Sequence, residues 1–182
     1  MRRVRYRVAA SLDGFIAGPK GEADWIIMDP EIDFASIFKQ FDTLLVGRGT
    51  FEAMLRARNA AIPGMKLFVF SRTLRQSDYP DVTILSENAA KTVSSLRKKP
   101  GKDIWLFGGS SLFSSLLNEG LVDTIEVAVI PVLLGEGIPL MLSSAPQTKL
   151  KLTGHKLYET TGIVSLQYAI RKRRQKRPQR RA

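Results

Sequence analysis

Apolar residues along the chain follow two different periods in turn. Short apolar runs of strand type alternate with stretches in which apolar residues recur every three or four positions, the spacing of one helix face. The runs that predict strands are residues 3–10, 43–46, 65–70, 82–85, 103–107 and 122–130. Strands alternating with helices predict an α/β domain with a largely parallel sheet.

The end of the domain has a different pattern. Residues 150–158 and 162–170 both alternate between apolar and polar positions, and Thr160-Thr161-Gly162 marks a turn between them. Two such runs joined by a turn are typical of an antiparallel pair. Because no linker or internal repeat is evident, residues 1–170 are predicted to form one domain, an α/β fold with a mostly parallel central sheet and an antiparallel C-terminal edge.

A helix is predicted to begin near residue 30. Asp29 is placed to cap it and Pro30 suits its first position, where a missing N–H costs nothing. Asp33 follows one turn later on the same side. The apolar residues of the predicted helix recur at the spacing of a buried stripe: Phe34, Ile37, Phe38 and Phe41.

Three predicted strands end in residues suited to phosphate groups. Residues 103–107 run into Gly108-Gly109-Ser110-Ser111, where either serine could cap the helix that follows. A helix start without bulky side chains offers free N–H groups and the positive dipole end to an anion, although a tight turn would need the same glycines. The other two ends are Gly47-Arg48-Gly49-Thr50, with Thr50 as a capping hydroxyl, and Ser71-Arg72. Because such ends meet at one edge of a parallel sheet, together they predict a nucleotide site.

The charge of the chain is concentrated at one end. The net charge is +11 over 182 residues, and residues 171–181 contain eight positive charges, so the remainder carries only about +3. Residues 171–182 are therefore expected to be a self-repelling, disordered basic tail. Such a tail could make weak, non-specific contact with nucleic acid or only aid solubility, and the absence of interleaved aromatic residues favours the second role.

Several classes of site are excluded by composition. The chain has no cysteine and a single histidine, His155, so disulfides, thiol chemistry and the common zinc sites are ruled out. A Ser-His-Asp triad would need His155, which lies in a strand-like segment. No apolar run is long enough for a membrane span, and charges interrupt any leader-like segment at the start. The expected location is the cytoplasm.

The ordered motifs resemble those of the dihydrofolate reductase-like superfamily. Within it, the chain is most similar to the reductase domain of the riboflavin-biosynthesis deaminase-reductases, as a stand-alone member without the deaminase half. The resemblance extends over residues 3–170. It is carried by Ser11-Leu12-Asp13-Gly14-Phe15-Ile16-Ala17, Asp24-Trp25, Val46-Gly47-Arg48-Gly49-Thr50-Phe51-Glu52, Phe107-Gly108-Gly109-Ser110-Ser111-Leu112 and Pro131-Val132-Leu133-Leu134-Gly135-Glu136-Gly137.

The resemblance implies a three-layer α/β/α fold, a homodimer and an NADPH-dependent reductase. The implied substrate is a pyrimidine- or pterin-like heterocycle, such as 5-amino-6-(5-phosphoribosylamino)uracil in riboflavin biosynthesis. Ala10 and Ile16 would wall the nicotinamide, and Asp13 and Trp25 would face the substrate. The remaining implied cofactor residues are Gly47, Arg48, Gly49, Thr50, Ser71 and Arg72 for the adenosine phosphates, and Gly108, Gly109, Ser110, Ser111 and Leu112 around the pyrophosphate.

Hydride transfer to such a substrate also needs a proton. The candidate catalytic carboxylates are Asp13, Asp29 and Asp33, although Asp29 could only be a helix cap and Asp33 a solvated side chain. Two alternatives remain at this stage. One is dihydrofolate reduction itself, and the other is a non-catalytic protein that binds nucleotides through its body or polyanions through its tail.

Overall fold

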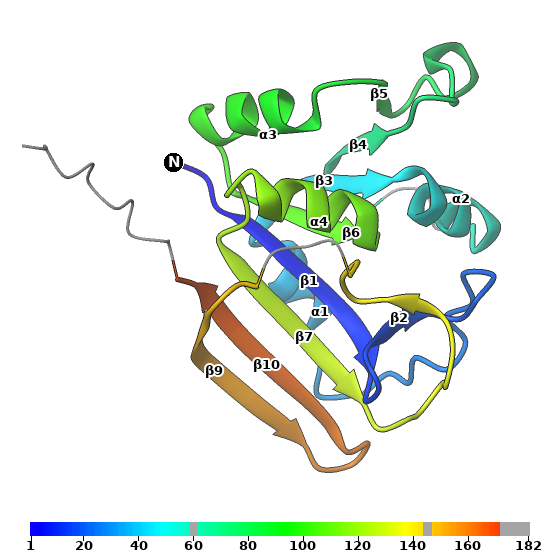
Figure 1. Cartoon of the computed structure of the whole chain (residues 1–182), viewed down its shortest axis with the longest axis vertical. Coiled ribbons are helices and arrows are strands. Elements are labelled where there is room, and N and C mark those ends of the chain that lie inside the picture. Colours follow the sequence, from blue (N-terminus) through cyan, green and yellow to red (C-terminus); the bar gives the residue numbers. More distant parts are fainter. Residues whose placement is uncertain (59–61, 144–146, 172–182) are drawn as a thin grey trace, which may run out of the picture.

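The structure, a computed structural model, describes residues 1–58, 62–143 and 147–171. Its centre is an eight-stranded sheet with the strand order β5-β4-β3-β6-β1-β7-β10-β9 (Figure 1). The predicted basic tail lies outside the described residues except for Arg171. The strands of the sheet are β1 (Val4–Ser11), β3 (Phe41–Gly47), β4 (Lys66–Phe70), β5 (Thr83–Leu85), β6 (Asp103–Gly108), β7 (Thr124–Ile130), β9 (Leu150–Tyr158) and β10 (Ile163–Ile170).

The pairing of the strands agrees with the sequence pattern. The first six strands along the sheet pair in parallel, whereas β10 pairs antiparallel with both β7 and β9. The alternating residues at the end of the chain therefore close one edge of the sheet, as predicted. A second, two-stranded sheet joins β2 (Phe15–Ala17) to β8 (Ile138–Pro139).

Helices cover both faces of the central sheet and complete the predicted three layers. Helices α3 (Ala89–Lys98) and α4 (Ser110–Asn118) pack on one face, and α1 (Phe34–Phe38) and α2 (Arg48–Arg56) pack on the other (Figure 1). A short 3₁₀ turn, Gln76–Asp78, lies between β4 and β5. The covering helices explain why the central residues of β3 and β6, 44–46 and 104–107, are apolar: both faces of the sheet are covered there.

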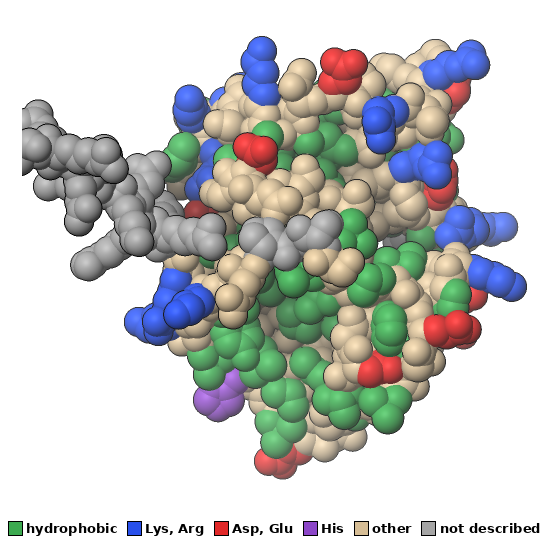
Figure 2. All heavy atoms as spheres, viewed as in Figure 1, with side chains coloured by type: hydrophobic (Ala, Val, Ile, Leu, Met, Phe, Trp, Pro, Cys, Tyr) green, Lys and Arg blue, Asp and Glu red, His purple; other side chains and the backbone are tan. Residues whose placement is uncertain are grey.

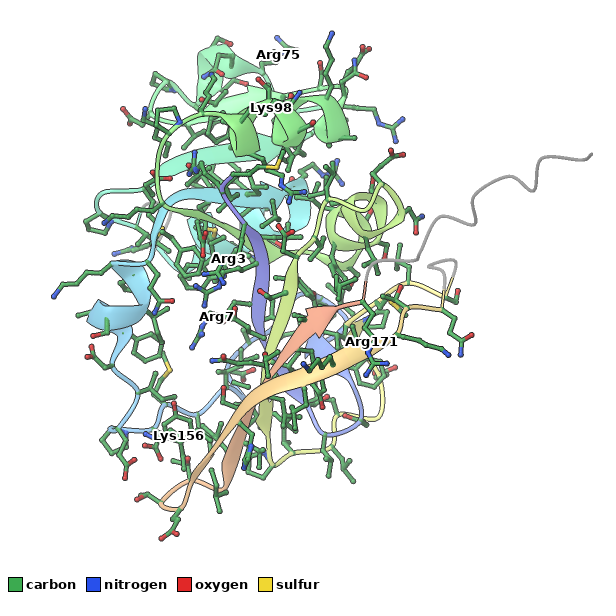
Figure 3. The ribbon with its side chains drawn as sticks, turned by 90° about the vertical axis from the view of Figure 1, so that its left-hand side faces the viewer. Arg3, Arg7, Arg75, Lys98, Lys156 and Arg171 are labelled. Carbon is green, nitrogen blue, oxygen red and sulfur yellow. The ribbon has the colours of Figure 1, made fainter. Side chains whose placement is uncertain are left out.

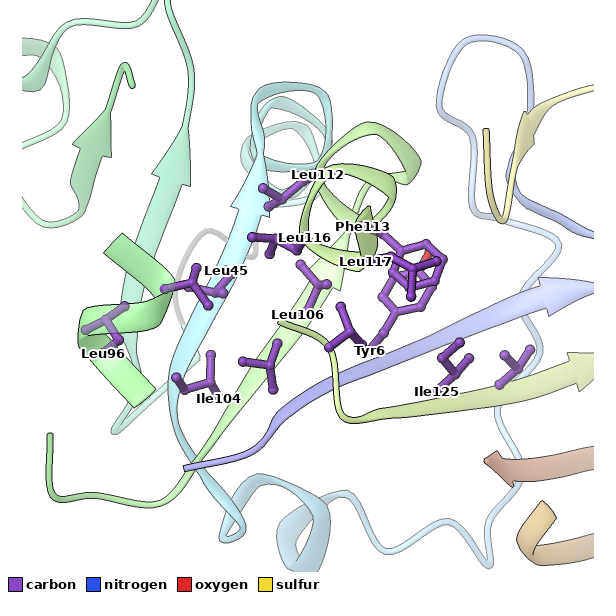
Figure 4. Close-up of a cluster of buried hydrophobic side chains, with 14 of the residues drawn as sticks. Tyr6, Leu45, Leu96, Ile104, Leu106, Leu112, Phe113, Leu116, Leu117 and Ile125 are labelled. Carbon is purple, nitrogen blue, oxygen red and sulfur yellow. The ribbon is translucent and has the colours of Figure 1, made fainter. Parts of the chain in front are cut away.

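The larger core cluster lies under α3 and α4 (Figure 4). The rings of Tyr6 and Phe113 stack there with centroids 3.8 Å apart and planes 8° from parallel. The Tyr6 hydroxyl donates to the Leu140 carbonyl at 3.2 Å, so burial leaves it satisfied. Each fully buried side chain of this size contributes about 1.5–3 kcal/mol, and the ring pair adds about 0.5–1.5 kcal/mol.

The helix predicted from Pro30 is shorter than expected. It spans only Phe34–Phe38, and its N-cap is Asp33, whose carboxylate accepts from the Ser36 N–H at 2.9 Å. Phe41, expected on the helical stripe, is the first residue of β3. The stripe spacing is real, but pairing of Phe41 with Asp103 of β6 takes this residue into the sheet.

Two predicted helix caps are also wrong. Helix α4 begins at Ser110 with Gly109 as N-cap, because the Ser110 hydroxyl donates to the Pro139 carbonyl instead of capping the helix. Helix α2 has Gly47 as N-cap and contains Thr50 within its first turn. Neither helix has a side-chain cap, which leaves its first N–H groups free of such a partner.

Candidate functional site

A cavity of about 1380 Å³ opens at the carboxyl ends of β3, β4 and β6 and continues under the sheet toward α1. In an open parallel sheet this edge is where ligands bind. The three strand ends singled out in the sequence all line it, as does Ile16. The sequence-predicted residues found in the lining are Ile16, Gly47, Arg48, Gly49, Thr50, Ser71, Arg72, Gly108, Gly109, Ser110, Ser111 and Leu112.

Three helices begin at the end of the cavity that lies beside the carboxyl ends of β3, β4 and β6. Their N-caps are Gly47 for α2, Asn88 for α3 and Gly109 for α4, and none makes a side-chain cap hydrogen bond. All three N-caps line the cavity. Free N–H groups and the positive ends of three helix dipoles therefore converge on one space, which favours an anion with several phosphate oxygens.

The two glycines before α4 are required by close packing. A side-chain carbon at either Gly108 or Gly109 would come within 3.3 Å of the Thr50 Oγ1 atom. Gly108 also has φ of +150°, which side chains of L-residues rarely adopt. The Gly108–Gly109 peptide bond is cis. The strand end thus presents bare backbone to the cavity, which allows a ligand to approach closely.

Arginines and hydroxyl groups stand together beside these helix starts. Arg48 donates from Nη1 to the Thr73 hydroxyl at 3.1 Å. The buried Ser71 hydroxyl oxygen accepts from the N–H groups of Thr73 and Leu74 at 3.2 and 3.1 Å, which fixes the turn that carries the exposed Arg72. Guanidinium groups next to hydroxyls are well suited to a phosphate monoester.

The other end of the cavity is mainly apolar, with Ser165 and one charged pair as its polar residues. It lies between β1, β6, β7 and β10 on one side and α1 with residues 26–28 on the other. Phe38 of α1 faces Trp105 of β6, with ring centroids 5.9 Å apart. The apolar side chains that line this end are Ile26, Ile27, Met28, Ile32, Phe34, Ile37, Phe38, Trp105, Phe107, Ile130 and Ile163.

The charged pair is Arg7 of β1 and Glu126 of β7, which are direct partners in the parallel register of the two strands. Arg7 donates from Nη1 to Glu126 Oε2 at 2.7 Å. Arg5 donates to both Glu126 oxygens, at 2.6 and 2.8 Å. Figure 3 shows Arg7 extending from β1 toward the side on which α1 lies.

Glu126 is buried yet charged. Burial alone would raise the pKa of its carboxyl, but hydrogen bonds and charge from Arg5 and Arg7 outweigh it, so the pKa of Glu126 lies below its ordinary value. Burial alone would lower the pKa of Arg5, but the hydrogen bonds and negative charges of Glu126 and Asp103 outweigh it and raise that pKa. Neither Arg7 nor Glu126 is among the site residues predicted from the sequence. The only signal for them is a pair of charged positions inside apolar strands, Arg7 between Tyr6 and Val8 and Glu126 between Ile125 and Val127.

Ala10 does not reach the cavity, contrary to expectation. Successive residues of a strand face opposite sides, so Ala10 points into the core and is 2% exposed, while Ala9 lines the cavity in its place.

The structure also places Asp13, expected to face the substrate and to act as an acid, outside the cavity lining. Its carboxylate accepts from the Ser11 hydroxyl at 2.6 Å and from the N–H groups of Leu134 and Gly135 at 3.0 and 2.7 Å. The Ser11 hydrogen bond, followed by the backbone ones, lowers the pKa of Asp13. Asp13 therefore fastens the loop after β1 to the loop after β7.

Asp29, Asp33 and Trp25 do not line the cavity either. The buried Asp29 accepts from the Glu31 N–H at 2.8 Å and from the Thr161 hydroxyl at 2.7 Å. Asp33 caps α1, and its hydrogen bonds to Ser36 lower its pKa. Trp25 packs against a separate small core and donates from Nε1 to the Glu22 carbonyl at 3.2 Å. Neighbouring residues 26–28, which were not singled out in the sequence, reach the cavity instead.

Two other kinds of site are absent from the described part of the chain. No group of three or more His, Cys, Asp or Glu side chains there could hold a metal ion. Nor do residues 1–58, 62–143 and 147–171 contain a helix of the length and apolarity needed to cross a membrane.

Solved structures with the same fold include two reductases. The dihydrofolate reductase of Enterococcus faecalis, solved with NADP(H), superimposes with a TM-score of 0.70 at 18% identity, covering 93% of this chain and 97% of that chain. The deaminase and 5-amino-6-(5-phosphoribosylamino)uracil reductase of Thermotoga maritima gives a TM-score of 0.69 at 17% identity, covering 93% of this chain and 56% of that chain. The fold is therefore dihydrofolate reductase-like.

Sequence relatives are closer. The protein YyaP of Bacillus subtilis (strain 168) is 37% identical over 179 residues, which are 92% of this chain and 94% of YyaP. The riboflavin biosynthesis protein RibD of Corynebacterium ammoniagenes is 26% identical over 161 residues, which are 76% of this chain and 45% of RibD. Residues 2–164 match the family described as the RibD C-terminal domain. The chain therefore belongs to the RibD C-terminal domain family.

Proposed function

We propose that the protein is an NADPH-dependent reductase that transfers a hydride to a pyrimidine- or pterin-like heterocycle. The observation that carries the proposal is the continuity of the cavity: one end gathers three helix N-termini with Arg48 and Arg72, and the other is apolar and closes on Arg7 and Glu126. A dinucleotide and a flat heterocycle need these two environments side by side. Membership of the family supports the same activity.

The cofactor end fits NADPH. Gly108 and Gly109 leave room where a side-chain carbon would crowd Thr50, so the pyrophosphate would lie against bare backbone at the start of α4. Arg48 and Arg72, beside the hydroxyls of Ser71 and Thr73, would hold the ribose 2′-phosphate. When bound, NADPH supplies the hydride, while the protein orients the reactants and excludes water.

The substrate end provides a wall, a lid and a charge. Trp105 and Phe107 form the wall, and the apolar side chains of α1 and of residues 26–28 cover it, which keeps water away from the reacting atoms. Arg7 is the cationic group in this end, so it would stabilise the negative charge that develops on an oxygen or ring nitrogen as hydride arrives. A substrate such as 5-amino-6-(5-phosphoribosylamino)uracil, which the Thermotoga maritima relative reduces, has oxo groups that would accept hydrogen bonds from Arg7.

Cofactor titration tests the proposal. Trp105 lines the cavity and Trp25 does not, so a Trp25→Phe variant reports binding through Trp105 alone. We expect NADPH to quench this fluorescence at micromolar concentration and NADH to bind at least about tenfold more weakly, a difference of about 1.4 kcal/mol from the 2′-phosphate. Consumption of NADPH with an aminouracil substrate then tests turnover. If neither NADPH nor NADH bound, the proposed function would be refuted.

We also propose that the protein is a homodimer that pairs through the face of β7, β10 and β9. Leu150, Leu152 and Leu157 of the edge strand β9 are 37%, 48% and 54% exposed and share one face of the sheet through their register with β10. Figure 2 shows hydrophobic side chains gathered over these strands. Contiguous apolar surface of this kind is typical of an interface.

Light scattering after gel filtration measures the oligomeric state. We expect the mass of a dimer for the wild type and of a monomer for a Leu152→Lys, Leu157→Lys double variant. Leu55→Lys is the matched control, because Leu55 is also 37% exposed but lies on α2. A monomeric wild type would exclude the dimer.

A further inference from the structure

One charged cluster joins β1 to β7 and consists of Arg5, Arg7 and Glu126. Its three side chains differ in how many of their hydrogen-bonding groups already have partners. Arg5 is fixed on all sides: Nε and Nη2 bind Glu126, Nη1 donates to the Gln40 side-chain oxygen at 2.7 Å, and the guanidinium lies 4.8 Å from the centre of the Phe41 ring. Its side chain is only 10% exposed, and it does not line the cavity. Arg5 therefore acts as an anchor for Glu126.

Glu126 has no accepting capacity left for a ligand. Its two oxygens receive four hydrogen bonds, two from Arg5, one from Arg7 at 2.7 Å and one from the Thr124 hydroxyl at 3.1 Å. The side chain is 4% exposed. A carboxylate held in this way can orient a neighbouring cation but cannot itself receive a donor from a bound heterocycle.

Arg7 differs from Arg5 in having free donors. Within the described residues its side chain has Glu126 as its one partner, through Nη1. Its side chain is 21% exposed, and no buried side-chain nitrogen in the described part of the chain lacks a partner, so the remaining N–H groups are open to the cavity. Arg7 thus presents donors and positive charge to whatever lies between α1 and the sheet.

The carboxylates that could have accepted hydrogen bonds from a ligand lie away from this end of the cavity. Asp13, Asp29 and Asp33 lie outside the lining and accept hydrogen bonds from their own loops. Glu87 lines the cavity at the other end, next to the start of α3. Among the described residues, the substrate end therefore contains no carboxylate with a free oxygen.

The two classes of heterocycle considered for this reductase need opposite partners. A diaminopyrimidine or aminopterin ring presents an amidine, a row of N–H donors that pairs with a carboxylate. A uracil-type ring presents carbonyl acceptors, and a phosphate adds anionic ones, which pair with a guanidinium. Leaving either ligand's polar groups unpaired in a dry site is costly, so the site discriminates by chemistry as well as by shape.

We propose that Glu126, anchored by Arg5, is a positioning residue that holds Arg7 toward the substrate end, and that Arg7 thereby selects heterocycles with oxo or anionic acceptors over those with an amidine. The proposal rests on the proposed reductase function, for which it names the substrate class. By this proposal, Arg7 and Glu126 favour the substrate of an aminouracil reductase over that of a dihydrofolate reductase.

The test compares two probes on the full chain by calorimetry. One probe is 5-amino-6-(ribitylamino)uracil 5′-phosphate, and the other is trimethoprim, a diaminopyrimidine. We expect the wild type to bind the uracil probe at least tenfold more tightly than trimethoprim. In Arg7→Met and Glu126→Gln we expect this ratio to fall toward one, with partial recovery in Glu126→Asp, while NADPH affinity stays within twofold of the wild type.

The ratio distinguishes a positioning role from a structural one, because damage to the fold would weaken both probes and NADPH together. Arg3→Met is the matched control: Arg3 lies just before the same strand, is 60% exposed and pairs with Asp103 away from the cavity, so its ratio should equal that of the wild type. Equal binding of the two probes by the wild type, binding of neither, or an unchanged ratio in Glu126→Gln and Glu126→Asp would each overturn the proposal. A wild type that kept its selectivity but did not bind NADPH would instead overturn the reductase function.

Discussion

Replacement of Gly108 by alanine tests whether close packing and a positive φ require glycine at the strand end before α4. At a φ of +150°, an alanine side chain costs about 1–3 kcal/mol of conformational strain. The added carbon would also lie 3.3 Å from the Thr50 Oγ1 atom, and overpacking of this kind costs about 1–3 kcal/mol. Gly108→Ala should therefore lower the free energy of unfolding by about 2–6 kcal/mol.

Urea denaturation followed by circular dichroism measures the effect. Gly49→Ala is the matched control, since nothing lies within 4 Å of a carbon added there, and an alanine within a helix should leave stability unchanged or raise it by up to about 1 kcal/mol. Adding Thr50→Ala to Gly108→Ala removes the contact with Oγ1 and should recover the overpacking part alone. Coincident urea midpoints for Gly108→Ala and the wild type would refute the reasoning.

Three further results are expected. Arg72→Gln should reduce the preference for NADPH over NADH about tenfold, measured by fluorescence titration, because one cation beside the 2′-phosphate is lost; an unchanged preference would remove Arg72 from the site. Asp13 has a lowered pKa in the folded state, so the stability that it contributes is present at neutral pH and is lost as the pH falls through and below the ordinary value of 3.8. Asp13→Asn should accordingly unfold with a weaker pH dependence in that acidic range, seen in thermal melts at several pH values, and parallel curves would contradict this assignment. Tyr6→Phe should cost about 1 kcal/mol of stability in urea, since the Leu140 carbonyl loses its donor inside the core; a variant of wild-type stability would show that the bond contributes nothing.

The order and kind of the main elements could be predicted from the sequence because periodicity is a local property. The alternation at residues 150–158 and 162–170 predicted the antiparallel edge, and the apolar runs predicted the parallel strands that the structure contains. The short helix α1 shows the limit of this reasoning. Phe41 has the spacing of a helical residue, but the energy of pairing with β6 decides its conformation, and that partner lies 62 residues away.

The candidate site likewise has one part that could be predicted from the sequence and another that could not. The phosphate-suited strand ends could be found because each is a short continuous motif. The role of the acidic residues could not be predicted, because Asp13, Asp29 and Asp33 accept hydrogen bonds from partners that a linear pattern does not reveal. Arg7 and Glu126 are 119 residues apart and meet only through the register of β1 with β7. Charged residues inside otherwise apolar strands were the available signal for this pair.

The small sheet of β2 and β8 connects two parts of the cavity lining, Ile16 and the start of α4. Phe15 pairs with Pro139, whose carbonyl accepts from the Ser110 hydroxyl at the start of α4. The segment that carries Ile16 is thereby braced against the helix start that would receive the pyrophosphate. The position of Ile16 relative to the start of α4 is therefore set by backbone pairing and by one side-chain hydrogen bond. A nucleotide bound as proposed would thus meet a wall and a helix start whose relative position the fold itself has fixed.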